Sequence, residues 1–223
     1  MWRDAALVAG KDLRIEARSR VATNQVAPFA LLVLVLFAFA LDPNRAVLKQ
    51  AAAGLYWVAV LFCSLLAVQR SSAVESAEGA RDQLRLSGLD PAGVFLGKAA
   101  AVAAQLLVLE LLLGAGVVIL YDVRLASLWL VTATCLLATV GLAAAGTLYG
   151  ALAGGLRVRE TLLPFLLLPV AAPVVLAGTR AWQAALGTAA GSAGDPWLRL
   201  LCVFAAVYLA LGVVIFGPML EAS

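Results

Sequence analysis

Long runs of apolar residues recur along the chain, and short polar connections separate them. A helix needs about 20 mostly apolar residues to cross the hydrocarbon core of a bilayer. The runs therefore predict six transmembrane helices, at Val26–Leu41, Ala51–Val68, Ala99–Leu120, Leu125–Gly155, Leu162–Ala177 and Leu200–Met219. We expect an all-α integral membrane protein.

Composition agrees with that pattern, because 64% of the 223 residues are hydrophobic and only 13% are charged. Six spans with short connections leave no room for a separate soluble domain. We expect one transmembrane domain over residues 1–223. It would consist of an interfacial helix at 1–22 and a six-helix bundle at 23–220, whose longest connection contains a cytoplasmic coupling segment at 71–90.

Lysine and arginine are distributed unevenly between the two sides of this predicted bundle. The arm before the first run and the second and fourth connections hold most of the 16 cations. Cytoplasmic connections of membrane proteins carry an excess of lysine and arginine. Both termini are therefore predicted to be cytoplasmic.

The N-terminal arm is amphipathic at helical spacing. One arc holds Trp2, Ala6, Ala9, Leu13 and Ala17, and the other holds Arg3, Lys11, Arg14 and Arg18. Such a helix would lie in the headgroup layer with its cations toward anionic lipid. Leu7, Val8 and Ile15 fall outside the apolar arc. The alternative is an ordinary solvated arm.

The connection Gln69–Lys98 carries helix signals of its own. Ser72 followed by Glu75 fits a capping box, which would start a short helix that Gly88 could end. Asp90–Pro91 fits the N-cap and first turn of the next span. Lys98 could extend back to the interface. The short helix would carry Glu75, Glu78, Arg81, Asp82 and Arg85, and it is either a docking element or a solvated turn.

Small residues and prolines mark the fourth and fifth runs. Gly146, Gly150 and Gly154 recur every four residues, a spacing that lets another helix approach closely, from this chain or from a second copy. Pro164, Pro169 and Pro173 each remove a backbone donor within a predicted helix. The prolines either only bend the helix, or they form a hinge or a segment that lines a pathway.

Two further features of the runs suggest specific roles. Glu110 is the one carboxylate deep in a run; ionisable groups in a membrane are functional candidates, although a packing role is the alternative. After the fifth run, Thr179–Arg199 combines Trp182 and Trp197, suited to an interface belt, with three glycines. We expect broken or half-inserted structure there.

Several classes of chemistry are excluded by what the sequence lacks. It has no histidine, the usual ligand of haem and transition metals, and no Gly-x-Ser-x-Gly motif. Gly93–Lys98 has the wrong spacing for a phosphate loop. The cations form no nucleic-acid patch. Cys63, Cys135 and Cys202 lie inside apolar runs and read as buried hydrophobes. Any ATPase would be another polypeptide.

The order of these parts resembles a type-2 ABC-exporter permease, and within that group the chain is similar to the CcmB family. The resemblance rests on Lys11-Asp-Leu-Arg-Ile-Glu-Ala-Arg18, Gly54-Leu-Tyr-Trp-Val-Ala59, Leu65-Leu-Ala-Val-Gln-Arg70, Glu78-Gly79, Asp82-Gln83-Leu84, Lys98, and Leu168-Pro169 with Pro173. Gly88 and Arg81 depart from the family pattern.

The resemblance implies the permease of the bacterial cytochrome c maturation system, in the inner membrane. Expected partners are a CcmA-like ATPase, which would bind ATP, the haem-handling proteins CcmC, CcmD and CcmE, and a second copy of the chain. Haem would be a substrate of the complex, with no cofactor bound by this subunit.

The resemblance also assigns roles to individual residues. The ATPase-coupling set is Arg70, Glu75, Glu78, Gly79, Asp82, Gln83 and Leu84. The elbow-helix set is Lys11, Arg14, Glu16 and Arg18. The hinge or pathway set is Glu110, Pro169 and Pro173, in which Glu110 is chosen because it is ionisable within a span and not because of the resemblance. Alternatives are a permease for another hydrophobic substrate and a structural assembly subunit.

Overall fold

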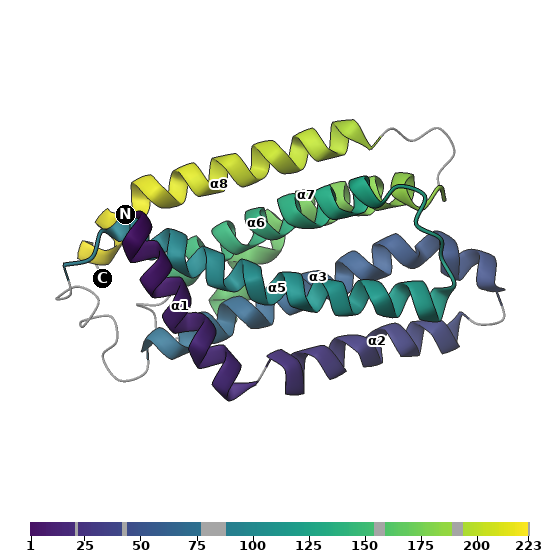
Figure 1. Ribbon diagram of the computed structural model, residues 1–223, viewed down its shortest axis with the longest axis horizontal. Coiled ribbons are helices and arrows are strands. Elements are labelled where there is room, and N and C mark those ends of the chain that lie inside the picture. Colours follow the sequence, from purple (N-terminus) through teal and green to yellow (C-terminus); the bar gives the residue numbers. More distant parts are fainter. Residues whose placement is uncertain (21, 42–43, 77–87, 154–158, 189–193, 223) are drawn as a thin grey trace.

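The computed structural model describes residues 1–20, 22–41, 44–76, 88–153, 159–188 and 194–222, and these residues are mostly helical (Figure 1). In chain order the elements are α1 (Trp2–Ser19), the π-helical segment η1 (Ala22–Val26), α2 (Ala27–Ala40), α3 (Arg45–Ser76), α5 (Pro91–Tyr121), α6 (Leu128–Ala153), α7 (Arg159–Ala185) and α8 (Asp195–Ala222). These ranges contain no β-strand. The predicted all-α membrane fold is confirmed.

Five of these helices, α3 and α5 to α8, are long and apolar enough to cross a bilayer. With 14 residues, α2 spans only about 21 Å, less than a hydrocarbon core of roughly 30 Å. The preceding π-helical residues lengthen it. Counted with α1, which meets the Asn24–Ala40 helix at a bend of 49°, it makes a sixth candidate span.

Two predicted boundaries are wrong, and in both places a helix continues further than expected. Ser72 lies inside α3, so no new helix begins there. Neither glycine nor proline interrupts the stretch from Leu55 to Ser76, so nothing local ends the helix earlier. Thr179–Ala185, expected to be broken, forms the last turns of α7. Gly187 follows with φ of +65°, a conformation that favours glycine.

The start of α5 agrees with its sequence signal. Asp90 is the N-cap, and its carboxylate accepts a hydrogen bond from the backbone N–H of Gly93 at 3.3 Å. Pro91 occupies the first turn, where its missing N–H leaves no bond unmade.

The helices pack around α5 and α6. Helix α5 contacts α1, α2, α3, α6 and α8, while α6 contacts α3, α5, α7 and α8. Figure 1 shows α2 and α8 along opposite edges of the bundle. Helix α1 crosses the others obliquely, at the end where both chain termini lie.

Aromatic side chains fill the centre between α3 and α7. The Tyr56 ring stacks on Trp182 with centroids 3.8 Å apart. Trp57 lies over Gly178, where a Cβ atom would come within 2.5 Å of the indole, so glycine gives the ring its space. Trp182 is 3% exposed, so its side chain packs within the bundle, and its predicted place in an interface belt stays a prediction.

The end of the bundle remote from α1 is held by polar contacts. The Tyr121 hydroxyl donates to the backbone carbonyl of Leu34 at 3.0 Å, joining α5 to α2. The Lys49 ammonium lies 2.8 Å from the Asp122 carboxylate and holds the pKa of that carboxyl below its usual value. The pair therefore persists at neutral pH and is lost as the pH falls through that lowered pKa.

Candidate functional site

Helix α1 lies directly on the first turns of α5, backbone against backbone. A Cβ atom on Gly93 would come within 2.7 Å of the Met1 carbonyl oxygen, and one on Gly97 within 2.6 Å of the Ala5 carbonyl oxygen. Two glycines four residues apart remove side chains from one stripe of a helix. Their spacing in the sequence is the signal that could have predicted this contact.

The packing gives α1 three faces rather than two. Val8, which falls outside the apolar arc, is the buried residue of α1 because it faces Gly97 on α5. Trp2 and Leu13 from the apolar arc remain exposed. The cations Lys11, Arg14 and Arg18 are exposed as well. The helix therefore has a protein-facing stripe, an apolar stripe available to lipid and a basic stripe.

Replacing Gly97 with alanine is expected to loosen α1. The added Cβ would clash with the Ala5 backbone carbonyl oxygen. A backbone atom cannot move aside as the end of a flexible side chain can. We expect a loss of about 1–3 kcal/mol, measured by thermal unfolding of the purified protein. Gly10, also on α1, has nothing within 4 Å of an added Cβ. Gly10→Ala is the matched control and should be neutral or slightly stabilising; an equal loss in both variants would contradict this packing.

Lys98 reaches α1 rather than open solvent. It is 3% exposed, and its ammonium lies 3.8 Å from the Asp12 carboxylate of α1. The same carboxylate group lies 3.1 Å from the Lys11 ammonium. Burying an ammonium is costly unless a negative charge lies close to it. The pairing of Lys98 with Asp12 therefore favours the placement of α1 against this part of α5.

Two more contacts connect α1 to the helices on either side of residues 77–87. Glu16 accepts from the Arg70 guanidinium at 2.9 Å, near the end of α3. Asp4 accepts from the backbone N–H of Asp90 at 3.4 Å, just before α5. We call these two contacts, together with Asp12–Lys98, the elbow contacts. They join α1 to both ends of the connection that carries the predicted coupling segment.

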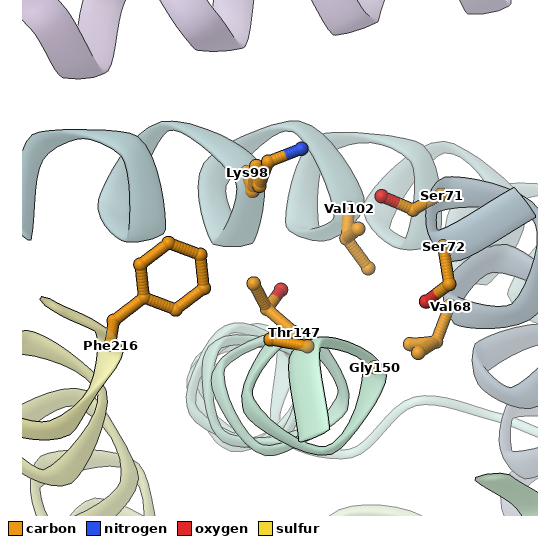
Figure 2. A pocket seen from close by; sticks show the side chains of 9 residues that line it. Val68, Ser71, Ser72, Lys98, Val102, Thr147, Gly150 and Phe216 are labelled. Carbon is orange, nitrogen blue, oxygen red and sulfur yellow. The ribbon is translucent and has the colours of Figure 1, made fainter. Parts of the chain in front are cut away.

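A small polar cavity lies beside the elbow contacts (Figure 2), between α3, α5, α6 and α8. Its volume of about 10 Å³ is close to the space for one water molecule. The Thr147 hydroxyl is buried there and has no hydrogen-bond partner among the described residues. Figure 2 shows the Lys98 amine directed away from Thr147. The cavity is too small for a larger ligand.

The glycine stripe of α6 faces α3 of the same chain. A Cβ on Gly146 would overlap the Val68 side chain, and one on Gly150 would come within 2.6 Å of the Ser72 hydroxyl oxygen. Gly154 lies outside the described residues. The two described glycines therefore serve packing within this chain.

Glu110 is 3% exposed in the middle of α5 and is surrounded by groups from other helices. The Thr139 hydroxyl of α6 donates to its Oε1 atom. The Tyr56 hydroxyl of α3 lies 3.3 Å from its backbone carbonyl and 3.5 Å from the Cys135 thiol. Sequence analysis missed these three neighbours because contacts between helices leave no local pattern.

The structure does not bring all the predicted hinge or pathway residues together. Pro169 and Pro173 are exposed on α7, which remains helical from Arg159 to Ala185. Neither proline lines the cavity that Glu110 borders. Their role as a hinge stays a prediction.

Most of the predicted coupling set lies beyond what the structure describes. Arg70 is described and pairs with Glu16. Glu75 belongs to the last turn of α3, and its side chain lies outside the described residues. Five further members lie entirely outside the described residues: Glu78, Gly79, Asp82, Gln83 and Leu84.

Known proteins are similar to this sequence over most of its length. Residues 4–223 match the family described as CcmB protein. Heme exporter protein B of Paracoccus denitrificans is 32% identical over 203 residues, which cover 90% of this chain and 89% of that protein. The heme exporter protein B of Bradyrhizobium diazoefficiens is 29% identical over 206 residues, covering 91% and 90%.

The agreement extends through the elbow helix, every predicted span and the connections between them. Because the family match runs over nearly the whole chain, it does not depend on any single motif. This chain belongs to the CcmB family.

Proposed function

We propose that this chain is the membrane permease subunit of an ABC-type haem-export complex in cytochrome c maturation. In this role it transmits ATP hydrolysis by a separate CcmA-like ATPase to haem export or to release of the haem-loaded chaperone CcmE. The observation that carries the proposal is the family match over residues 4–223, together with relatives named heme exporter protein B. The subunit itself catalyses no reaction in this account.

The elbow contacts supply a mechanical route for the coupling. Helix α1 is joined to α3 by Glu16–Arg70 and to α5 by Asp12–Lys98. An ATPase that pushes on residues 77–87 would therefore move the ends of α3 and α5 together with α1. We propose that the coupling set contacts the ATPase and that the elbow contacts carry the movement into the bundle.

The distribution of cations favours a cytoplasmic position for both termini and for the coupling segment. The proposed location of the chain is the bacterial inner membrane, with the ATPase on the cytoplasmic side. The sequence has no imidazole to ligate haem iron, which favours a subunit that moves over one that holds the metal. Paired ATPases would call for a second copy of this chain, beside CcmC, CcmD and CcmE.

Deletion of the gene in its bacterial host is expected to abolish c-type cytochromes, detected by haem staining of membrane proteins after electrophoresis. A plasmid copy should restore them. Affinity purification of the tagged chain should recover an ATPase subunit. Normal c-type cytochromes in the deletion strain would refute the proposal and favour a permease for another hydrophobic substrate. Full complementation without any associated ATPase activity would favour a structural assembly subunit.

A further inference from the structure

The acidic and basic side chains of α1 lie on different faces of the helix. All three of its carboxylates are partly buried, and each makes one of the elbow contacts. All five cations of residues 1–20 are exposed. Among the described residues, Arg14 and Arg18 make no ion pair, and Lys11 pairs only with the neighbouring Asp12. The outer face of α1 therefore carries uncompensated positive charge.

Two exposed stripes of α1 face the surroundings next to each other. At about 100° per residue, the apolar stripe of Trp2 and Leu13 and the basic stripe are centred about a third of a turn apart. Trp2 is 75% exposed and Leu13 is 38% exposed. An aqueous surrounding would leave the apolar stripe in water, and an acidic protein surface would satisfy only the cations. The boundary between acyl chains and anionic headgroups offers an apolar and a negative region together.

The packing of α1 places both stripes at the end of an apolar span. Its backbone contacts Gly93 and Gly97, in the first two turns of the candidate span Pro91–Tyr121. The boundary between hydrocarbon and headgroups lies where such a span begins. Figure 1 shows α1 crossing the other helices obliquely at this end of the bundle. The cations of α1 are therefore at the level of the lipid phosphates.

A hollow of about 400 Å³ follows the basic stripe along α1. Its lining on α1 combines the three cations with the side chains of Leu7 and Ile15, which are 58% and 36% exposed. Gly10 also lines the hollow, and nothing lies within 4 Å of a Cβ added there, so a headgroup can approach the helix backbone. Arginine presents its N–H donors in a planar fork that matches phosphate oxygens.

We propose that this hollow binds the headgroup of one anionic phospholipid, with Arg14 and Arg18 donating hydrogen bonds to its phosphate and Lys11 beside them. The apolar stripe then lies among acyl chains of the same leaflet. A zwitterionic headgroup fits less well, because its ammonium is repelled by the three cations. The inference goes beyond the proposed function, since it requires only that the chain spans a bilayer and involves neither the ATPase nor haem.

The test is native mass spectrometry of the full chain in detergent, which counts bound lipids during titration with phosphatidylglycerol or with phosphatidylcholine. We expect the first phosphatidylglycerol molecule to bind at least tenfold more tightly than phosphatidylcholine. Inorganic phosphate at equal ionic strength should not displace it, because phosphate brings no acyl chain to the apolar stripe. Equal affinity for the two lipids would overturn the proposal, and displacement by phosphate would show a site for soluble anions instead.

A pair of double variants locates the lipid on α1. Arg14→Gln/Arg18→Gln removes both guanidinium groups and leaves the elbow contacts in place. It should weaken phosphatidylglycerol binding at least fivefold. Arg124→Gln/Arg180→Gln removes the same charge from two exposed residues outside α1 and is the matched control. Its affinity should stay within twofold of the original chain; equal weakening in both variants would show general attraction by net charge and contradict a site on α1.

A third variant separates a defined site from diffuse attraction along the helix. Gly10→Leu keeps every charge and fills the hollow from its open side, where no atom obstructs the added side chain. It should weaken phosphatidylglycerol binding at least threefold while thermal unfolding in detergent without lipid changes little. An unchanged affinity would refute the site. If Arg14→Gln/Arg18→Gln kept its lipid affinity but lost an associated protein from the purified complex, the basic stripe would belong to an acidic partner and the proposal would fail.

Discussion

Replacing Asp12 with alanine is expected to release α1 from the bundle and to lower the free energy of unfolding by about 2–4 kcal/mol. Removing one partner of a buried ion pair costs roughly 3–5 kcal/mol, because the remaining buried charge loses a compensating group. Lys98 is almost fully buried, whereas the Asp12 side chain is 15% exposed, which places the expected loss toward the lower end. Thermal unfolding and limited proteolysis after α1 measure the effect.

A second variant distinguishes loss of the pair from loss of packing. Lys98→Met keeps an unbranched chain of similar length without the charge, so the double variant Asp12→Ala/Lys98→Met leaves no buried ammonium. It should recover at least half of the lost stability. Equal destabilisation of the single and double variants would show that Asp12 acts through a contact other than Lys98.

Reversing the charge of Arg70 is expected to reduce the formation of c-type cytochromes about tenfold while the protein remains in the membrane. Arg70→Glu places two carboxylates where Glu16 and Arg70 now lie 2.9 Å apart, and like charges at that distance repel. The end of α3 would then move independently of α1. Haem staining normalised to the amount of membrane-inserted protein gives the readout.

Exchange of the two charges provides the control for this effect. The double variant Glu16→Arg/Arg70→Glu restores opposite charges and should recover at least half of the cytochrome signal. Arg14→Glu, on the exposed basic stripe of the same helix, should have a smaller effect. Failure of the exchange to rescue would indicate that Arg70 contributes through the ATPase rather than through Glu16.

The transmembrane helices could be predicted because lipid imposes a length and a composition on each span. Where a helix leaves the apolar region, that constraint ends, and both errors occur there. Helix α3 continues past Ser72, where no proline or glycine lies nearby, and α7 continues past Thr179 although Gly178 directly precedes it. The N-cap at Asp90 was correct because its signal is local.

The elbow contacts could not be predicted, although their residues could be singled out. Asp12 and Lys98 are far apart in sequence, and nothing in a charge pattern says which carboxylate faces which cation. The same holds for Glu16 and Arg70. Gly93 and Gly97 have the same four-residue spacing as Gly146 and Gly150 on α6, but with Lys98 beside them they also resemble part of a phosphate loop. Val8 is buried because it packs against α5 at Gly97, a contact that the pattern of α1 alone does not reveal.

The most direct test of this account asks on which side of the membrane the connection between α3 and α5 lies. A cysteine replacing Arg81 should react with a membrane-impermeant maleimide only after the cells are opened. A cysteine replacing Asp122, at the opposite end of α5, should react in intact cells. Labelling of the Arg81→Cys variant from outside intact cells would place residues 77–87 away from the ATPase and contradict the coupling mechanism.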